Sequence, residues 1–218
     1  MRVVCWVSRC STQPTLFYGT SGEINHRRKG RRWAMRYRRS RATGGCYFFT
    51  VVTFRREKIL TREDNVQLLR DGMRRIMRAH PFCIDAFVLL PDHLHCIWTL
   101  PNGDADFSLR WRLIKSDFSR RCKGNSTYVP PASRRRKNER AIWQRRFWEH
   151  QIRDAHDFRR HVEYIHYNPV RHKYAAEPQG WPFSSFHKYV RQGKYAPTWG
   201  ASQDFKAQEI MTRAGWVE

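Results

Sequence analysis

The hydrophobic positions along the middle of the chain gather in several short runs that are typical of β-strands. Residues 46–54, CYFFTVVTF, follow a Gly-Gly turn and are rich in aromatic and β-branched residues, which is typical of a core strand. Two more strands are predicted at 82–90 and 93–100. The Pro-Asp corner between them is too short for a parallel crossover, so they are expected to be antiparallel. A fourth strand is predicted in 141–152, AIWQRRFWEHQI.

Segments with helical spacing separate these strands. The segment 61–80 opens with a capping threonine and an acid three residues later, and its apolar residues recur at positions 66, 69, 73, 76 and 77. Further helices are predicted at about 108–121, at 154–171 with an end near Asn168-Pro169, and within 181–190. This order predicts an α+β fold, with an antiparallel sheet and helices packed on one face.

The two ends of the chain lack this patterning. Residues 1–34 show no sustained period and end in a basic cluster. The sequence that begins at Met35 is more typical of the start of a folded protein. We therefore expect a flexible basic extension over 1–34, one domain over 35–195 and a weakly structured tail over 196–218. The extension is either an upstream mis-start or an arm that binds phosphates.

The charge balance indicates the kind of partner. The 218 residues include 42 Lys and Arg against 19 Asp and Glu, a formal net charge of +23. Such an excess repels itself in a compact fold and favours a polyanionic partner such as nucleic acid. No apolar run approaches the roughly 18 residues that span a bilayer, so no membrane partner is expected. The six cysteines are scattered without a C-x-x-C pair, so we expect reduced thiols and a cytoplasmic protein rather than a zinc ribbon.

Two histidines stand one residue apart in LLPDHLHCIW, inside a predicted strand. Side chains alternate along a strand, so His93 and His95 project from the same face. Two imidazoles that converge from one strand form half of a metal site. The alternative for an isolated H-x-H motif is a hydrogen-bonded or surface pair.

A second group of polar residues lies on the predicted helix 154–171. Tyr164 and Asn168 are four residues apart, and His161 is three residues before Tyr164, so all three share one helical face. Facing a histidine pair, a tyrosine and an amide oxygen would provide a nucleophile and a third metal ligand. The alternative for the tyrosine is packing in the core.

The ordered set of motifs resembles the REP-associated tyrosine transposases, a branch of the single-tyrosine HUH transposases, in which H-U-H denotes His-hydrophobic-His. The resemblance rests on PDHLHCIW, YIHYNPVRHKY and WPFSSFHKY, together with GGCYFFTVVTF, LPDHLHCIWTLPNGDADFSLRWRLIK and WQRRFWEHQIRD. It extends from about Met35 to Tyr189. It implies the ferredoxin-like fold of the HUH endonucleases.

The resemblance also implies an activity and its residues. His93, His95 and Asn168 are expected to hold a divalent metal, magnesium or manganese, and Tyr164 is expected to be the nucleophile. The substrate is expected to be single-stranded or hairpin DNA, cleaved and rejoined through a 5′-phosphotyrosine intermediate in DNA transposition or repeat mobilisation. Related insertion-sequence enzymes work as dimers, so a homodimer and a monomer are both open for this chain.

Basic and aromatic residues alternate in LRWRLIK and WQRRFW, as in grooves that bind single strands. The predicted DNA contacts are Arg110, Arg112, Lys115, Arg145 and Arg146. The alternative is that the aromatic residues belong to the core, with solvated arginines between them. For the whole chain, the alternative functions are a non-catalytic DNA hairpin-binding protein and an RNA-binding protein.

Overall fold

The computed structural model describes residues 43–123, 132–136 and 140–201. The predicted extension 1–34 and most of the predicted tail lie outside these residues. The strands are β1 (Cys46–Val52), β2 (Cys83–Leu89), β3 (His93–Thr99) and β4 (Trp148–Gln151). The helices are α1 (Glu63–Ala79), α2 (Phe107–Arg121), α3 (Ala132–Arg135), α4 (Ala155–Arg171) and α5 (Phe186–Arg191), with single 3-10 turns at Phe54–Arg56 and Pro178–Gly180. No helix within the described ranges is long and apolar enough to cross a bilayer.

The four strands form one antiparallel sheet in the order β2-β3-β1-β4. The backbone N–H of Leu90 donates to the carbonyl of His93 at 2.8 Å, so Pro91 and Asp92 form the tight turn between β2 and β3. This turn confirms the predicted hairpin, and the predicted α+β class is confirmed with it. Strand β1 lies in the middle of the sheet, between β3 and β4.

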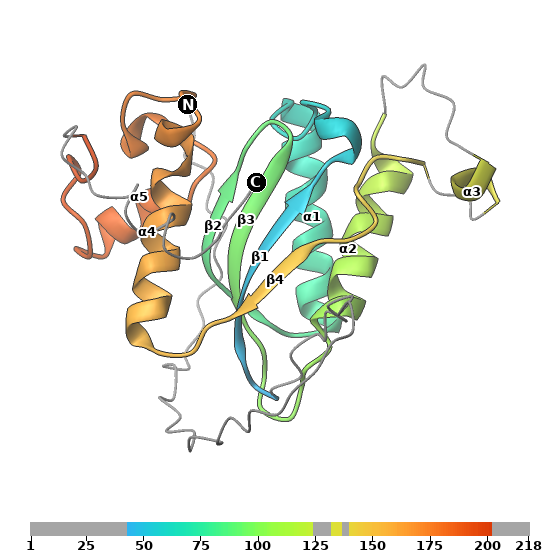
Figure 1. The fold of residues 1–218 in the computed structure, drawn as a ribbon, viewed down its shortest axis with the longest axis horizontal. Helices are drawn as coiled ribbons and strands as arrows, with labels where there is room; N and C mark the ends of the chain where they lie inside the picture. The colour runs from blue at the N-terminus through green and yellow to red at the C-terminus, as the bar shows by residue number, and fades with distance from the viewer. Residues whose placement is uncertain (1–42, 124–131, 137–139, 202–218) are drawn as a thin grey trace, which may run out of the picture.

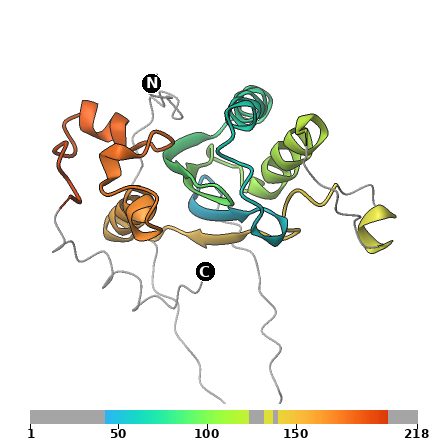
Figure 2. The same ribbon diagram turned by 90° about the horizontal axis from the view of Figure 1, so that it is seen from above.

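Helices cover both faces of the sheet, so the prediction that they pack on one face is wrong. Figure 1 and Figure 2 show α1 and α2 on one side of the sheet and α4 on the other. The reason lies in the strands themselves, which are apolar on both faces. Residues 47–49 of β1 are all buried, and so are residues 86–89 of β2. A sheet with two apolar faces stays stable in water only when both are covered.

The alternation of side chains divides β1 and β3 into two sets. The aromatic face, which packs against α1 and α2, carries Tyr47, Phe49, Val51, Leu94, Cys96 and Trp98. The histidine face, which packs against α4, carries Phe48, Thr50, Val52, His93, His95 and Ile97. On the aromatic face the rings of Trp98 and Trp111 stack 4.1 Å apart, and Trp111 comes from α2.

Three local predictions differ from the structure. Strand β4 is shorter than the predicted 141–152, because Ala141 has a positive φ of 54° and only Trp143 forms an isolated bridge before β4 begins. Helix α4 continues through Pro169 to Arg171, because the carbonyls of Asn168 and Pro169 accept hydrogen bonds from the next turn. Helix α1 begins at Glu63 without a side-chain cap.

The cysteines also depart from the prediction at one position. Cys83 is in a disulfide bond, whereas Cys46, Cys96 and Cys122 are free thiols. Cys83 is the first, half-buried residue of the edge strand β2. Cys96 and Cys122 are buried, so other thiols do not reach them.

Candidate active site

His93 and His95 stand on β3 and point to the helix α4 side of the sheet, as the strand period predicts. Their side chains are 2% and 1% exposed, and their ring centres lie 4.9 Å apart. The register pairs His95 with Thr50 of β1 and with Val88 of β2, so the histidine pair sits in the centre of the sheet. Hydrogen-bonded strands on both sides hold this part of β3 rigidly.

The carboxylate of Asp92 fixes the orientation of the His93 ring. His93 Nδ1 lies 2.7 Å from Asp92 Oδ1, and Arg56 forms an ion pair with the same carboxylate at 3.2 Å. Burial would raise the pKa of Asp92, but the hydrogen bond and charge of His93 and the contact with Arg56 lower it to about 2. Asp92 is therefore ionised at neutral pH and accepts the Nδ1 proton. This leaves Nε2 as the ring nitrogen of His93 that is available to a ligand.

His95 joins β1 to the helix α4. Its Nδ1 lies 2.9 Å from Thr50 Oγ1, and its Nε2 lies 3.3 Å from the hydroxyl of Tyr164. An Nδ1–H that donates to Thr50 leaves Nε2 as the acceptor for the tyrosine hydroxyl. The sequence prediction that the helix brings Tyr164 to the histidine pair agrees with this geometry.

The ring of Tyr164 is held firmly beside the histidines. It is 8% exposed and packs against Phe48 and His95, with ring-centre distances of 5.8 and 5.0 Å. The guanidinium of Arg171, two turns further along α4, lies 6.0 Å from the ring centre. These contacts fix the direction in which the hydroxyl of Tyr164 points.

Asn168 follows Tyr164 by one helical turn and is fully buried. Neither its amide oxygen nor its amide nitrogen has a hydrogen-bond partner among the described residues, and the same holds for His93 Nε2. Buried polar atoms without partners are rare in proteins and indicate a missing ion, water or ligand. Two imidazoles and an amide oxygen suit a divalent metal such as manganese. The donor set therefore fits the metal that the sequence analysis predicts.

The five basic residues predicted to contact DNA are in different environments. Arg110 is 2% exposed, and its guanidinium bonds to both carboxylate oxygens of Asp104, at 3.1 and 2.5 Å, and to the carbonyl of Pro81. Arg110 is thus a structural residue of α2, and the prediction that it contacts DNA does not fit this burial. The amino group of Lys115 lies against the carbonyl of Gln144. The exposed predicted residues are Arg112, Arg145 and Arg146.

His161 does not join the histidine pair, although the helical period places it on the Tyr164 side. Its Nδ1 lies 3.1 Å from Asp157 Oδ1 and 2.7 Å from the Asp157 carbonyl, and His150 Nε2 lies 2.8 Å from Asp157 Oδ2. The ligand atoms of these three residues lie within 4.8 Å of one another, so they could also hold a metal. Because they hydrogen-bond to one another, they tie β4 to the first turns of α4 without an ion.

A residue absent from the predicted site, His172, also reaches it. Its ring centre lies 5.2 Å from that of His93. The spacing of four residues after Asn168 was visible in the sequence as a signal, but the predicted helix end near Pro169 hid it.

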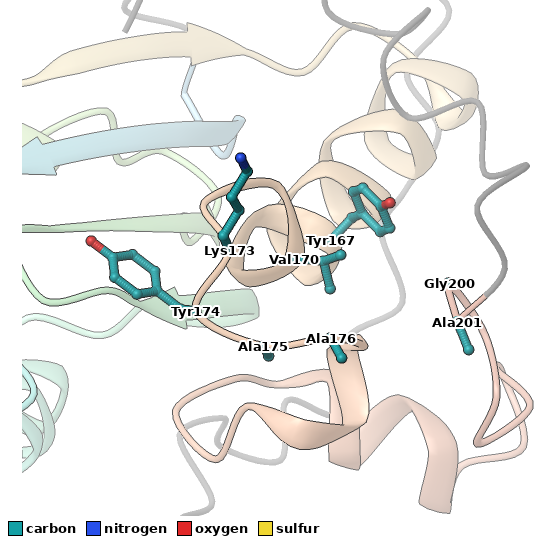
Figure 3. A pocket seen from close by; sticks show the side chains of 8 residues that line it. All are labelled: Tyr167, Val170, Lys173, Tyr174, Ala175, Ala176, Gly200 and Ala201. Atoms are coloured by element: carbon teal, nitrogen blue, oxygen red, sulfur yellow. The ribbon is translucent and has the colours of Figure 1, made fainter.

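A cavity of about 530 Å³ lies at the C-terminal end of α4. Figure 3 shows Tyr167 pointing away from the sheet and Tyr174 pointing toward it, with Lys173 between them along the chain. The cavity is lined by Tyr167, Val170, Lys173, Tyr174, Ala175, Ala176, Gly200 and Ala201. None of the predicted site residues lines it, so it is separate from the histidine pair.

Comparisons with known proteins point to one family. No protein-family model matches the chain. The chain is 45% identical over 175 residues to the REP-associated tyrosine transposase of Escherichia coli (strain K12), which covers 79% of this chain and 96% of that protein. A relative of the same family in Haemophilus influenzae (strain ATCC 51907 / DSM 11121 / KW20 / Rd) is 38% identical over 170 residues, covering 78% and 96% of the two chains.

A solved structure is similar as well. The structure of a REP-associated tyrosine transposase bound to a REP hairpin has a TM-score of 0.63 and 44% sequence identity to this chain. The match covers 78% of this chain and 94% of that one. The two sequence relatives and this structure agree over nearly the full length of each relative, and on that basis the chain belongs to the REP-associated tyrosine transposases.

Proposed function

We propose that this transposase cleaves and rejoins single-stranded hairpin DNA, with Tyr164 as the nucleophile and a divalent metal as the cofactor. The observation that carries the proposal is the hydroxyl of Tyr164, which lies 3.3 Å from His95 Nε2 and on the same helical face as Asn168, whose amide has no hydrogen-bond partner among the described residues. A nucleophile beside a metal-ligand set is the arrangement that phosphodiester cleavage by tyrosine requires.

The chemistry at Tyr164 is a phosphoryl transfer. The phenolic oxygen attacks the phosphorus atom as its proton departs, and a bond forms between that oxygen and the phosphorus. The bond from phosphorus to the 3′ oxygen breaks, and that oxygen leaves as a 3′ hydroxyl after gaining a proton. The 5′ phosphate remains on the tyrosine, so the same hydroxyl can attack in reverse and rejoin the strand without an external energy source.

His93, His95 and Asn168 would hold the metal. When bound, the metal neutralises the charge on the non-bridging phosphate oxygens and orients the phosphate. The chain's own residues prepare this site. Asp92 fixes the orientation of the His93 ring, Thr50 forms a hydrogen bond with His95 Nδ1, and the packing of Phe48 holds the Tyr164 ring.

The proposed DNA path crosses the histidine face near β4. Trp148, at the start of this edge strand, is 40% exposed, and its ring packs edge-on against Phe48, 5.7 Å away. An exposed indole next to the active site suits the stacking of an unpaired base. Arg145 and Arg146 precede it directly and are exposed, as is Arg112, so these three arginines are the proposed backbone contacts. The solved relative bound to a REP hairpin supports a hairpin substrate.

The proposal also covers the bounds of the catalytic domain and the cell compartment of the enzyme. We place the catalytic domain at 35–195 and give residues 1–34 and 196–218 no part in the chemistry. Because the substrate is DNA, we place the enzyme in the cytoplasm. A chain that starts at Met35 is then expected to form the same DNA adduct as the full chain.

The decisive experiment mixes the full chain with a labelled single-stranded hairpin and manganese and resolves the products by denaturing electrophoresis. A covalent adduct and a cleaved strand are expected. Tyr164→Phe should abolish both and leave hairpin binding within about twofold, because only the attacking oxygen is lost. Tyr167→Phe is the matched control, since Tyr167 lies on the same helix but lines the separate cavity.

Three results would change the proposal. An adduct that persists in Tyr164→Phe and disappears in Tyr167→Phe would move the nucleophile. Tight hairpin binding by the wild type without any adduct would indicate a non-catalytic binding protein. Preference for an RNA hairpin of the same sequence would favour an RNA-binding protein.

A further inference from the structure

His172 is the residue that follows helix α4, one turn beyond Asn168. Its backbone N–H donates to the carbonyl of Asn168 at 3.0 Å, so the position of His172 is tied to that of Asn168. The residue is half-buried, but its Nε2 atom is shielded from solvent. On one side its ring lies parallel to Tyr174, with ring centres 6.1 Å apart, and Figure 3 shows that Tyr174 points toward the sheet. The imidazole is therefore held in place and turned inward.

The other neighbour of the His172 ring is His93. The ring centres are 5.2 Å apart and the planes are inclined by 69°. The pair of His93 and His95 has almost the same geometry, at 4.9 Å and 81°. The His93 ring thus has two imidazole neighbours, His95 and His172, at nearly equal ring-centre distances.

This spacing matches imidazoles that share one ion. A metal-bound imidazole nitrogen lies about 2.0–2.1 Å from zinc, which places the ring centre ~3.2 Å from the ion. Two such rings in a tetrahedral arrangement have centres ~5 Å apart. Both ring pairs of His93 fall at this value.

A direct hydrogen bond between His93 and His172 would give a similar ring distance, but the structure argues against it. His93 Nδ1 is occupied by Asp92, and His93 Nε2 has no hydrogen-bond partner within the described ranges. The lone pair of His93 Nε2 therefore does not receive a proton from His172. A common ion accounts for the distance and for the unused lone pair together.

We propose that His172 is a third imidazole ligand of the divalent metal held by His93, His95 and Asn168. This inference rests on the proposed metal site and extends its ligand set. Three imidazoles and one amide oxygen favour manganese, cobalt or zinc over magnesium, which prefers oxygen ligands. His172 thereby sets the metal preference of the enzyme.

The test measures metal binding in the full chain without DNA. Calorimetric titration with Mn²⁺ and with Mg²⁺, and the visible absorption of the Co²⁺ complex, are recorded for the wild type, His172→Ala and His172→Gln. Loss of one ligand should weaken Mn²⁺ and Co²⁺ binding about 10- to 100-fold in both variants and reduce the cobalt absorption. Mg²⁺ binding should change by less than about threefold. His156→Ala is the matched control, because His156 is an exposed histidine on the same helix.

A set of outcomes separates this inference from the proposed function. If His93→Ala abolishes Mn²⁺ binding while both folded His172 variants stay within about twofold of the wild type, His172 is not a ligand and the inference fails alone. If His93→Ala also leaves Mn²⁺ binding unchanged, the proposed metal site itself fails. Circular dichroism of each variant establishes that it is folded, and the glutamine variant keeps the polar volume if the alanine variant unfolds.

Discussion

The two faces of the sheet come from the same strands and differ in what they bury. The aromatic face packs large rings, and Trp98, Trp111, Phe49 and Phe107 are all buried there within 6 Å of a neighbouring ring centre. Within the described ranges, the buried polar atoms of these side chains that have no hydrogen-bond partner are the indole N–H groups of Trp98 and Trp111, which do not bind metals. The histidine face instead buries imidazoles and a hydroxyl beneath α4.

Within one sheet, the aromatic face mainly stabilises the fold, whereas the histidine face carries the candidate active site. A buried polar atom without a partner destabilises a fold by about 1–3 kcal/mol. The histidine face carries such atoms at His93 and Asn168 among the described residues. On the aromatic face, close ring packing offsets the cost of the two indole N–H groups. Removing a buried ring from the aromatic face should therefore destabilise the protein, whereas replacing a buried polar group of the histidine face by an apolar one should not.

The largest effect on stability is expected on the aromatic face. Trp98→Ala removes a fully buried indole that stacks on Trp111, and the cavity should lower the free energy of unfolding by about 3–5 kcal/mol. Urea unfolding followed by circular dichroism measures this change. A loss below about 1 kcal/mol would mean that the aromatic face is not the main source of stability.

The next effect is a loss of stability in acid, which arises from two buried histidines of α4. Burial lowers the pKa of His166 to about 3, and burial, opposed by the Asp157 contacts, lowers that of His161 to about 4. Below about pH 6.5 these histidines bind protons in the unfolded chain but stay neutral in the folded protein. Stability should thus be full above pH 6.5 and fall by up to about 1.4 kcal/mol per pH unit for each histidine as the pH decreases toward 4.

Unfolding in urea at a series of pH values measures this loss. The variant His166→Gln cannot take up a proton and keeps a polar group beside Ser185, whose hydroxyl lies 2.7 Å from His166 Nε2. Its stability should fall less steeply than that of the wild type between pH 6.5 and 4. Parallel profiles for the two proteins would exclude His166 as a source of the acid sensitivity.

A smaller effect, of opposite sign, is expected at the active site. Asn168→Leu replaces a buried amide, which has no partner in the part of the chain that the structure describes, by an apolar side chain of similar size. Stability in chelator should therefore stay the same or rise by about 1–3 kcal/mol. Metal binding and DNA cleavage should be lost in the same variant. A clear loss of stability in chelator would show that Asn168 serves the fold rather than the chemistry.

The smallest effect on stability is expected at Trp148→Ala. The indole is 40% exposed, so the free energy of unfolding should change by about 0.5 kcal/mol or less. Binding of a single-stranded DNA should nevertheless weaken by about 1–3 kcal/mol, because a stacking platform is lost. Fluorescence anisotropy with a labelled strand measures this change, and unchanged binding would remove β4 from the proposed DNA path.

Much of the fold and the placement of the candidate site residues were visible in the sequence, because the periods that carry them are local. The two-residue period put His93 and His95 on one face of β3, and the helical period put Tyr164 and Asn168 on one face of α4. These features depend only on the geometry of a single strand or helix. The predicted hairpin at Pro91-Asp92 is local in the same sense.

Other features required the tertiary structure. The sequence could not show that α4 packs on the face opposite α1 and α2, since strands that are apolar on both sides accept helices on either one. It also could not show that Arg110 turns inward to Asp104, which depends on how a loop folds back against α2. His172 meets His93 only because α4 continues through Pro169 and ends over β3. Contacts between residues far apart in the chain are fixed by packing, and local spacing alone does not determine them.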